Sequence, residues 1–259
     1  MTEHTQKLYV GWYDTNQNAW YPVGQLYTDG NRYCFEYLQG ASQAQAYSGF
    51  RGIFQFSDFD RTYESSELFA FFSNRVLTSS RDNFADEVAR LGFDTEPQSL
   101  RPFDVLSRTN GRRATDTFEV FPPPEVVDNR AELVFFSRGI RYLREALKRR
   151  WEQGRAPQTP LRLKWDKAND FDEHALKILD AEGTSLGYLP RYYSESFCQL
   201  VNANCDYDLQ IVQHNRQPGF VRERFLMRLT SDTPTEWHFP QSELYEPMNS
   251  MDAHTPVVA

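Results

Sequence analysis

Cysteine is scarce in this 259-residue sequence, and its three cysteines, Cys34, Cys198 and Cys205, are widely spaced. An odd number at such spacing indicates neither a disulfide framework nor a paired C-x-x-C metal knuckle. His214 lies near the last cysteine, but scatter of this kind is typical of structural residues rather than of a zinc site. We therefore expect no metal and no cofactor.

Long apolar runs are also missing. No segment is apolar over the length that a membrane span or the core of a signal peptide requires, so we expect a cytoplasmic protein without membrane contact. The content of 40% hydrophobic and 15% aromatic residues is nevertheless enough to build one large or two ordinary domains.

Motifs of the common enzyme classes are absent as well. The sequence has no G-x-S-x-G nucleophile turn, no Gly-rich phosphate loop and no catalytic-loop motif followed by a D-F-G-like metal ligand. We therefore expect no enzyme activity. A metal-dependent nuclease remains an alternative, because carboxylates that suit a hard divalent ion gather in two loops; these candidates are Asp58 and Asp60, and Asp170, Asp172, Glu173 and His174.

Positive charge is in deficit, with a net charge of -8. Any contact with nucleic acid must therefore come from a local basic patch. The strongest candidate has ten basic residues against three acidic ones, Glu145, Glu152 and Asp166. The basic residues are Arg138, Arg141, Arg144, Lys148, Arg149, Arg150, Arg155, Arg162, Lys164 and Lys167. A solvated helix face is the alternative interpretation. A second basic cluster, over residues 108–113, lies on a predicted turn, and a hairpin solubilised by charge is its alternative interpretation.

Aromatic residues interleave with the basic patch. Unpaired bases stack on aromatic rings and guanidinium planes, so this combination favours single-stranded DNA over duplex. Each ring is equally explained as part of a core, because small β-rich folds need large side chains. The candidates are Tyr142, Phe171, Tyr188, Tyr192 and Tyr193.

Hydrophobic patterning predicts a β-rich α+β chain. In the first half we expect strands over 7–13, 20–27, 32–38 and 115–121, with helices over 65–77 and 81–91. In the second half we expect strands over 132–136, 161–165, 207–213 and 222–230, a hairpin over 175–189, and helices over 142–153 and 192–203. The prolines after Phe121 predict a linker over 122–130, and the polar composition from Asp232 predicts a poorly ordered tail to residue 259.

The second half contains three blocks in succession: Gly139–Tyr142 (GIRY), Asp166–Ala175 (DKANDFDEHA) and Leu186–Arg191 (LGYLPR). These blocks and their order resemble the HIRAN domain family over about residues 131–231. The resemblance implies an OB-like β-barrel with helical insertions, whose pocket holds the terminal nucleotides of a single strand with a 3'-hydroxyl.

The resemblance also implies roles for individual residues. Arg141 and Tyr142 would hold a phosphate and stack a base, Phe171 would add an apolar wall, and Asp172 would accept a hydrogen bond from the terminal hydroxyl. Capping of a local turn is the alternative role of Asp172. The remaining DNA-binding candidates are Arg138, Arg144, Lys148, Lys167, Tyr188, Arg191 and Phe225.

The first half also contains three distinctive blocks, Trp20–Leu26 (WYPVGQL), Tyr63–Phe69 (YESSELF) and Thr109–Asp116 (TNGRRATD). Through these blocks, residues 1–121 resemble the N-terminal subdomain of HipA-type toxin kinases, without the kinase machinery. The sequence thus predicts a non-catalytic DNA-binding accessory protein of bacterial DNA repair or defence, with a protein partner for the first half. A docking subunit of a larger nuclease, helicase or effector complex is a further alternative.

Overall fold

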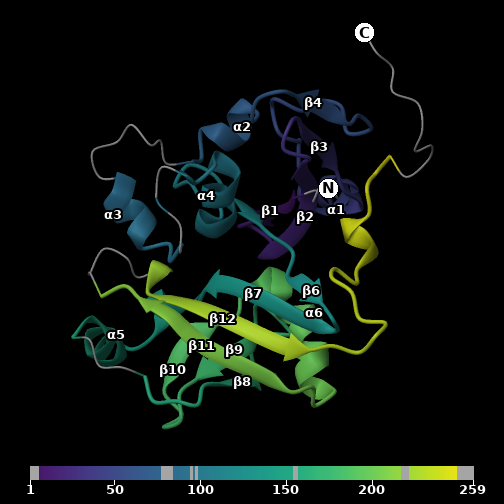
Figure 1. Ribbon diagram of the computed structural model, residues 1–259. Coiled ribbons are helices and arrows are strands. Elements are labelled where there is room, and N and C mark those ends of the chain that lie inside the picture. Colours follow the sequence, from purple (N-terminus) through teal and green to yellow (C-terminus); the bar gives the residue numbers. More distant parts are fainter. Residues whose placement is uncertain are drawn as a thin grey trace. The chain divides into compact units, whose positions relative to one another are not determined.

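The computed structural model describes residues 6–76, 84–93, 96, 99–153, 157–216 and 222–249 (Figure 1). The chain divides into two compact units. Unit 1 comprises residues 1–81, 98–123 and 240–259, and unit 2 comprises residues 82–97 and 124–239. The predicted linker at 122–130 includes the point at which the chain leaves unit 1, but each unit contains more than one stretch of sequence.

Unit 1 contains a five-stranded antiparallel sheet in the order β4-β3-β2-β1-β5. Its strands are β1 (Gln6–Asp14), β2 (Ala19–Thr28), β3 (Tyr33–Tyr37), β4 (Tyr63–Ser65) and β5 (Phe118–Phe121). The predicted meander of the first three strands is confirmed, because each pairs with the next along the chain. The last predicted strand is confirmed in a shorter form.

The helices of unit 1 differ from the prediction. They are α1 (Gln39–Ser48), α2 (Ala70–Ser73) and α4 (Pro102–Thr109), with a 3-10 turn, η4 (Glu243–Tyr245). The helix predicted over 65–77 is wrong, because within the described residues only 70–73 are helical. The helical spacing of apolar residues there arises from an aromatic core, in which Phe72 is wholly buried.

A buried tyrosine organises that core. The Tyr37 and Phe59 rings stack with centroids 4.3 Å apart, and Phe35 stacks on Phe56 at 4.0 Å. The Tyr37 hydroxyl accepts the Ile53 N–H and donates to the Phe56 carbonyl, each at 2.7 Å. Burial raises the pKa of Tyr37 to about 12, so its hydroxyl remains a donor at physiological pH.

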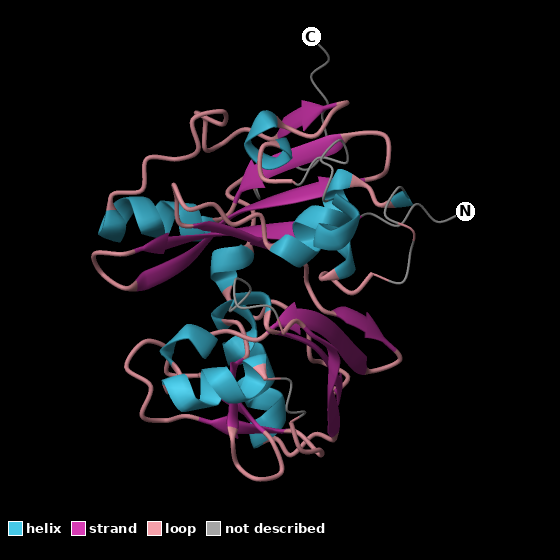
Figure 2. Ribbon diagram, turned by 90° about the vertical axis from the view of Figure 1, so that its left-hand side faces the viewer, coloured by secondary structure: helices cyan, strands magenta, loops and turns pink. Residues whose placement is uncertain are grey.

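Unit 2 contains two antiparallel sheets (Figure 2), of four strands in the order β11-β12-β7-β6 and of three in the order β10-β9-β8. The strands are β6 (Glu125–Val127), β7 (Arg130–Phe136), β8 (Arg162–Trp165), β9 (Leu176–Leu179), β10 (Ser185–Tyr188), β11 (Tyr207–His214) and β12 (Phe225–Asp232). The helical elements are α3 (Phe84–Ala89), η2 (Ile140–Tyr142), α5 (Glu145–Glu152) and α6 (Arg191–Asn202). The predicted order of elements is confirmed.

Four expectations for unit 2 need correction. The described residues form no closed barrel; an isolated bridge between Arg138 and Tyr188 joins segments of the two sheets. The predicted linker contains the edge strand β6, and the helix predicted from Tyr142 begins only at Glu145, after a 3-10 turn. The first part of the predicted poorly ordered tail packs within unit 2, since Trp237 is buried. The described residues 240–249 belong to unit 1, where Pro247 forms a bridge with Leu38.

Part of the prediction falls on residues that the structure does not describe. Of the helix predicted over 81–91, residues 84–89 are helical and residues 81–83 lie outside the described ranges, as do residues 250–259 of the predicted tail. No helix in the described part of the chain combines the length and apolar character that a membrane span needs.

Candidate nucleic-acid interface

The candidate interface begins at the bridge between Arg138 and Tyr188. Each residue donates its backbone N–H to the carbonyl of the other, at 2.8 and 2.9 Å. Gly187 permits this approach: its φ is +100°, and a Cβ there would lie 2.3 Å from the Arg138 carbonyl oxygen. Gly139, with φ +77°, then turns the chain into η2. Gly139 and Gly187, which come from two different HIRAN-like blocks, therefore shape the same part of the structure.

The η2 turn presents Arg141 and Tyr142 to solvent. Its first residue, Ile140, is buried and anchors the turn, whereas Tyr142 is 76% exposed. The Arg141 guanidinium lies 4.5 Å from the centroid of the Tyr142 ring and donates to the Tyr142 hydroxyl. Lys148 donates to the Arg141 carbonyl at 3.2 Å. An exposed ring beside a guanidinium provides a surface for a base and a phosphate together.

The loop between β8 and β9 carries Phe171 and Asp172. The Asn169 side-chain oxygen accepts the N–H groups of both residues, at 2.9 and 3.1 Å, which fixes the loop. Asp172 Oδ1 accepts the His174 N–H at 3.0 Å, so the turn-capping role of Asp172 is confirmed for one oxygen. Phe171 is 64% exposed. The loop thus holds an outward-facing ring beside a fixed carboxylate.

A network on the three-stranded sheet links Tyr188 to Asp166 and Lys177, neither of which was predicted to be a DNA-binding residue. The Tyr188 hydroxyl donates to Asp166 Oδ2 at 2.7 Å, and Lys177 Nζ lies 3.5 Å from the same oxygen. The Tyr188 hydrogen bond, followed by the Lys177 charge, lowers the pKa of Asp166. Hydrogen bonding to Tyr188 and the charge of Asp166 raise the pKa of Lys177. The pair is therefore ionised at neutral pH.

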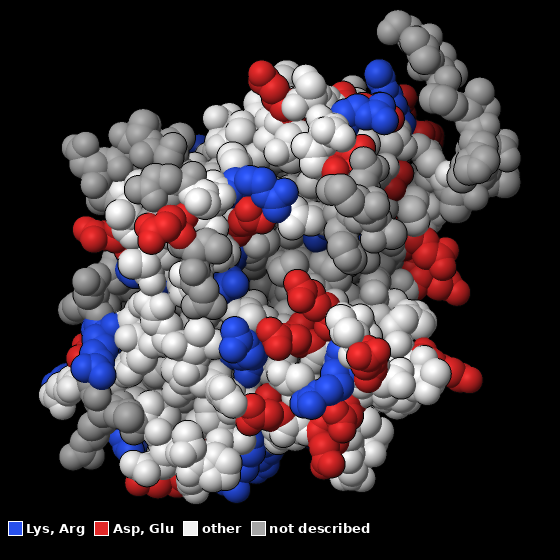
Figure 3. Space-filling model, viewed as in Figure 1, with Lys and Arg blue, Asp and Glu red and all other residues white. Residues whose placement is uncertain are grey.

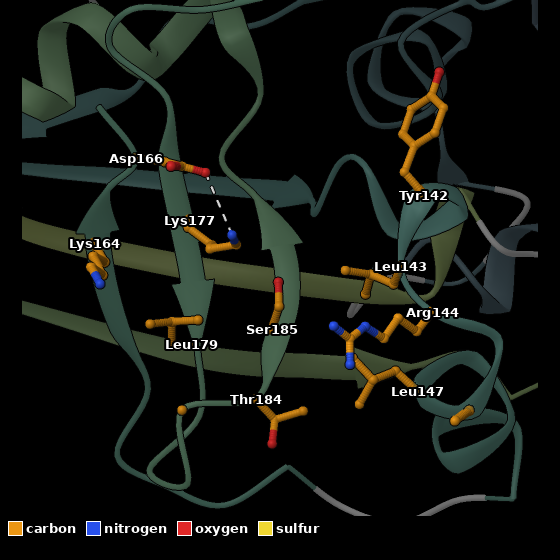
Figure 4. Close-up of a pocket in the computed structure, with 12 residues that line it drawn as sticks. Tyr142, Leu143, Arg144, Leu147, Lys164, Asp166, Lys177, Leu179, Thr184 and Ser185 are labelled. Atoms are coloured by element: carbon orange, nitrogen blue, oxygen red, sulfur yellow. Dashed lines mark hydrogen bonds and ion pairs between the residues drawn. The ribbon is translucent and has the colours of Figure 1, made fainter. Parts of the chain in front are cut away.

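A groove of about 750 Å³ lies between this sheet and the segment from η2 into α5 (Figure 4). One wall consists of Tyr142, Leu143, Arg144, Ala146 and Leu147, and the other of Lys164, Asp166, Lys177, Leu179, Gly183, Thr184 and Ser185. In Figure 4, Arg144 extends from its wall toward the strands, and the Tyr142 ring points away from them. Of the predicted DNA-binding residues, the structure places Tyr142 and Arg144 on this groove.

Other predicted site residues lie beside the groove or away from it. Arg138 donates to the Tyr192 hydroxyl at 3.2 Å, and Arg191 is exposed at the start of α6. Lys148 forms an ion pair with Glu145. Lys167 Nζ lies 4.4 Å from the centroid of the Trp165 ring, on the strand that leads into the Phe171 loop.

The prediction that Phe225 offers a stacking surface is wrong. Phe225 is wholly buried, with its ring centroid 5.5 Å from that of Trp151 and 4.6 Å from that of His214. Tyr192 and Tyr193 are buried too, so the core interpretation of these two aromatics is confirmed. The exposed rings that remain near the predicted site are Tyr142 and Phe171.

Some basic residues of the predicted patch form ion pairs with neighbouring carboxylates. Arg150 pairs with Glu182 at 2.9 Å, in addition to the Lys148–Glu145 pair. Figure 3 shows one face of the molecule, where basic and acidic side chains intermingle. Elsewhere in unit 2, Arg228 pairs with Glu132 at 3.4 Å. In unit 1, Arg112 of the second basic cluster pairs with Glu119. Arg155 lies outside the described residues.

The carboxylates of the nuclease alternative make local backbone contacts. Asp58 Oδ1 accepts the Asp60 N–H at 3.0 Å, as Asp172 Oδ1 does for His174. Within the described residues, no group of three or more His, Cys, Asp and Glu side chains is arranged to hold a metal ion.

Comparison with known proteins supports the interpretation of the second half. Residues 131–232 match the family model of the HIRAN domain, which confirms that resemblance. HIRAN domains are associated with DNA binding, including recognition of single strands and 3' ends, in repair. The HipA-like resemblance of the first half stays a prediction.

Two further comparisons add little. No curated protein matches the chain. A crystal structure of a protein from Lactobacillus plantarum is similar over 39% of this chain and 96% of its own, with 16% sequence identity and a TM-score of 0.31.

Proposed function

We propose that the protein is a non-catalytic DNA-binding accessory protein that engages single-stranded DNA or DNA ends through unit 2. The match of residues 131–232 to the HIRAN domain carries the proposal. The arrangement of Arg141 and Tyr142 supports it. The Tyr142 ring is exposed beside the Arg141 guanidinium, and a base stacked on this ring would remove its apolar surface from water. We place this activity in bacterial DNA repair or defence.

The proposed binding geometry uses the two exposed rings and the carboxylate. Tyr142 stacks a base, and Arg141 contacts the adjacent phosphate. Phe171 provides a second apolar surface, and Oδ2 of Asp172 accepts the hydrogen bond of a terminal 3'-hydroxyl, since Oδ1 is occupied by the His174 N–H. A phosphate at the same position would be repelled by the carboxylate, which gives a physical basis for preferring a free 3' end.

The test is a titration of fluorescent single strands and blunt duplex with wild type and Arg141→Gln. We expect single strands to bind more tightly. Arg141→Gln should weaken binding and reduce the slope of log affinity against log salt by about 0.7, the contribution of one phosphate contact to a single strand. Arg228→Gln removes a paired charge elsewhere in unit 2 and is the control.

The outcomes separate the functional classes. Absence of DNA binding by the wild-type protein would overturn the proposal, as would an Arg141→Gln variant with an unchanged salt slope. Strand cleavage that requires magnesium and stops in EDTA would establish the nuclease alternative instead.

A protein-docking role for unit 1 has one specific observation in its favour. The Phe54 side chain is fully exposed on a turn whose ends are held by the buried Tyr37 hydroxyl, through Ile53 and Phe56. A rigidly presented aromatic ring is typical of an interface anchor. A photo-cross-linking amino acid at position 54 should capture one defined protein, and the same probe at exposed Gln17 should not.

A further inference from the structure

The three-stranded sheet of unit 2 carries an unusual cross-strand pair. Lys164 of β8 lies directly opposite Lys177 of β9, and Lys177 is in turn opposite Tyr188 of β10. Side chains in such a row share one face of the sheet, so the two lysines are neighbours. Like charges placed directly opposite each other destabilise a sheet. Asp166 offsets the charge of Lys177 but not that of Lys164.

Arg144, on the opposite wall of the groove, is a second cation without a counter-ion among the described residues. Arg144 is exposed, and no ion pair of Arg144 or Lys164 is found among the described residues. By contrast, Lys148 and Arg150 of α5, the helix that follows Arg144, form ion pairs with Glu145 and Glu182. Figure 4 places Arg144 and Lys164 on opposite sides of the groove, so each is positioned to meet a different part of one bound molecule.

Apolar side chains line part of the groove between these cations. Leu143 and Leu147 lie on one wall and Leu179 on the other, and Ser185 adds a hydroxyl beside Leu179. A ligand that matches this arrangement carries separated negative charges with flat apolar groups between them. A single-stranded phosphodiester chain has this chemistry, because phosphates alternate with sugars and bases.

We propose that this groove binds the phosphodiester strand that leads away from the terminal nucleotides, with Arg144 and Lys164 contacting separate phosphates. The inference rests on the proposed function and extends it beyond the end-binding residues. Tyr142 and Asp166 connect the two regions: Tyr142 lines the groove, and Asp166 accepts the hydrogen bond of Tyr188. The groove thus adds length-dependent affinity to end recognition.

The experiment compares strands of about four and about sixteen nucleotides, which span the range of site sizes for small single-strand-binding domains. The wild-type protein should bind the longer strand more tightly. The double variant Arg144→Gln/Lys164→Gln should lose about tenfold or more in affinity for the longer strand, and the slope of its salt dependence should fall by about 1.4. Its affinity for the shorter strand should change little.

A matched control removes two positive charges elsewhere in unit 2. Arg130→Gln/Arg228→Gln has the same net charge as the groove variant, but the two arginines pair with Asp232 and Glu132 on the other sheet. This control should keep the length dependence of the wild-type protein. The groove variant should also be at least as resistant to urea as the wild-type protein, because it relieves the repulsion between Lys164 and Lys177.

The possible results distinguish this inference from the proposed function. If the wild-type protein binds single strands and the groove variant binds both lengths with unchanged affinity and salt slope, the groove proposal is overturned and end binding stands. Equal loss of affinity in the groove variant and in the matched control would also overturn it. Absence of binding by the wild-type protein to either strand overturns both proposals.

Discussion

Arg138 and Tyr188 exchange both of their backbone hydrogen bonds, although fifty positions separate them in the sequence. This single bridge connects the segment that enters η2 to the edge of the three-stranded sheet. It therefore sets the position of Arg141 and Tyr142 relative to Tyr188. Gly187 makes the contact possible, since any side chain there would collide with the Arg138 carbonyl.

Gly187→Ala should destabilise unit 2 and weaken DNA binding together. The substitution combines an unfavourable positive φ with a backbone clash, and we expect a loss of about 2 to 4 kcal/mol in the free energy of unfolding. Gly183→Ala is the matched control, because Gly183 also has a positive φ, while its nearest neighbour, an Arg162 nitrogen, lies 3.6 Å away. Urea denaturation of the two variants measures the difference, and equal losses would contradict the account.

Tyr142→Ala should weaken binding to single strands by about 1 to 3 kcal/mol, the usual contribution of one stacked base. Because the ring is 76% exposed, the same variant should unfold at nearly the same urea concentration as the wild-type protein. Phe225→Ala should show the opposite pattern of a severe loss of stability, because Phe225 is wholly buried. A Tyr142→Ala variant that binds as tightly as wild type would remove the stacking role.

Asp166→Asn should lower stability at neutral pH, and the difference from wild type should vanish in acid. The Tyr188 hydrogen bond and the Lys177 charge lower the pKa of Asp166 below its ordinary value of 3.8. A carboxyl whose pKa is lowered in the folded state stabilises the protein fully above its unfolded-state pKa of 3.8, and this contribution is lost progressively as the pH falls from there through the lowered pKa. Melting temperatures between neutral pH and about pH 3 test this prediction; a constant difference over that range would contradict it.

His214 should make unit 2 sensitive to moderate acid. Burial, together with the charges of Arg216 and Arg224, lowers the pKa of His214 from 6.5 to about 4. Between these two pH values the unfolded chain binds a proton that the folded protein does not, so stability should fall as the pH drops from 6.5 to about 4. His214→Gln does not titrate, so its stability should change less over this interval. Parallel pH profiles for the two proteins would rule out this role.

The extent to which the fold was predictable depends on the kind of signal each element leaves. Strands β1, β2, β3 and β5 of unit 1 were predicted because apolar and polar residues alternate along them, whereas the three-residue strand β4 was not predicted. Helix α1 was missed because its buried residues, Gly40, Ala41 and Ala44, are small and leave no apolar stripe. Helix α4 was also missed, although the sequence contains signals for both of its ends. Pro102 is typical of a first helical turn, and Asn110 is a residue that adopts the left-handed conformation found at the end of this helix.

The candidate site was predictable where it is local and not where strand pairing creates it. The blocks around Arg141, Asp172 and Tyr188 are continuous in sequence and could be recognised by their residues. The approach of Lys177 to Asp166 and the opposition of Lys164 and Lys177 depend on the register of β8, β9 and β10, which the sequence pattern does not specify.

The error at Phe225 has a different cause. Phe225, Leu226 and Met227 are all wholly buried, so both faces of the sheet are covered where β12 begins. A strand that is covered on both faces shows no alternation of apolar and polar residues that would assign this ring to the core.

The most direct test of the central claim is the affinity of the protein for one single strand that ends in either a 3'-hydroxyl or a 3'-phosphate. The account predicts tighter binding of the 3'-hydroxyl strand. It also predicts that Asp172→Asn removes the preference, because asparagine retains the oxygen that caps His174 and loses the second acceptor. Equal affinity of the wild-type protein for the two strands, or a preference that survives in Asp172→Asn, would contradict end recognition by this carboxylate.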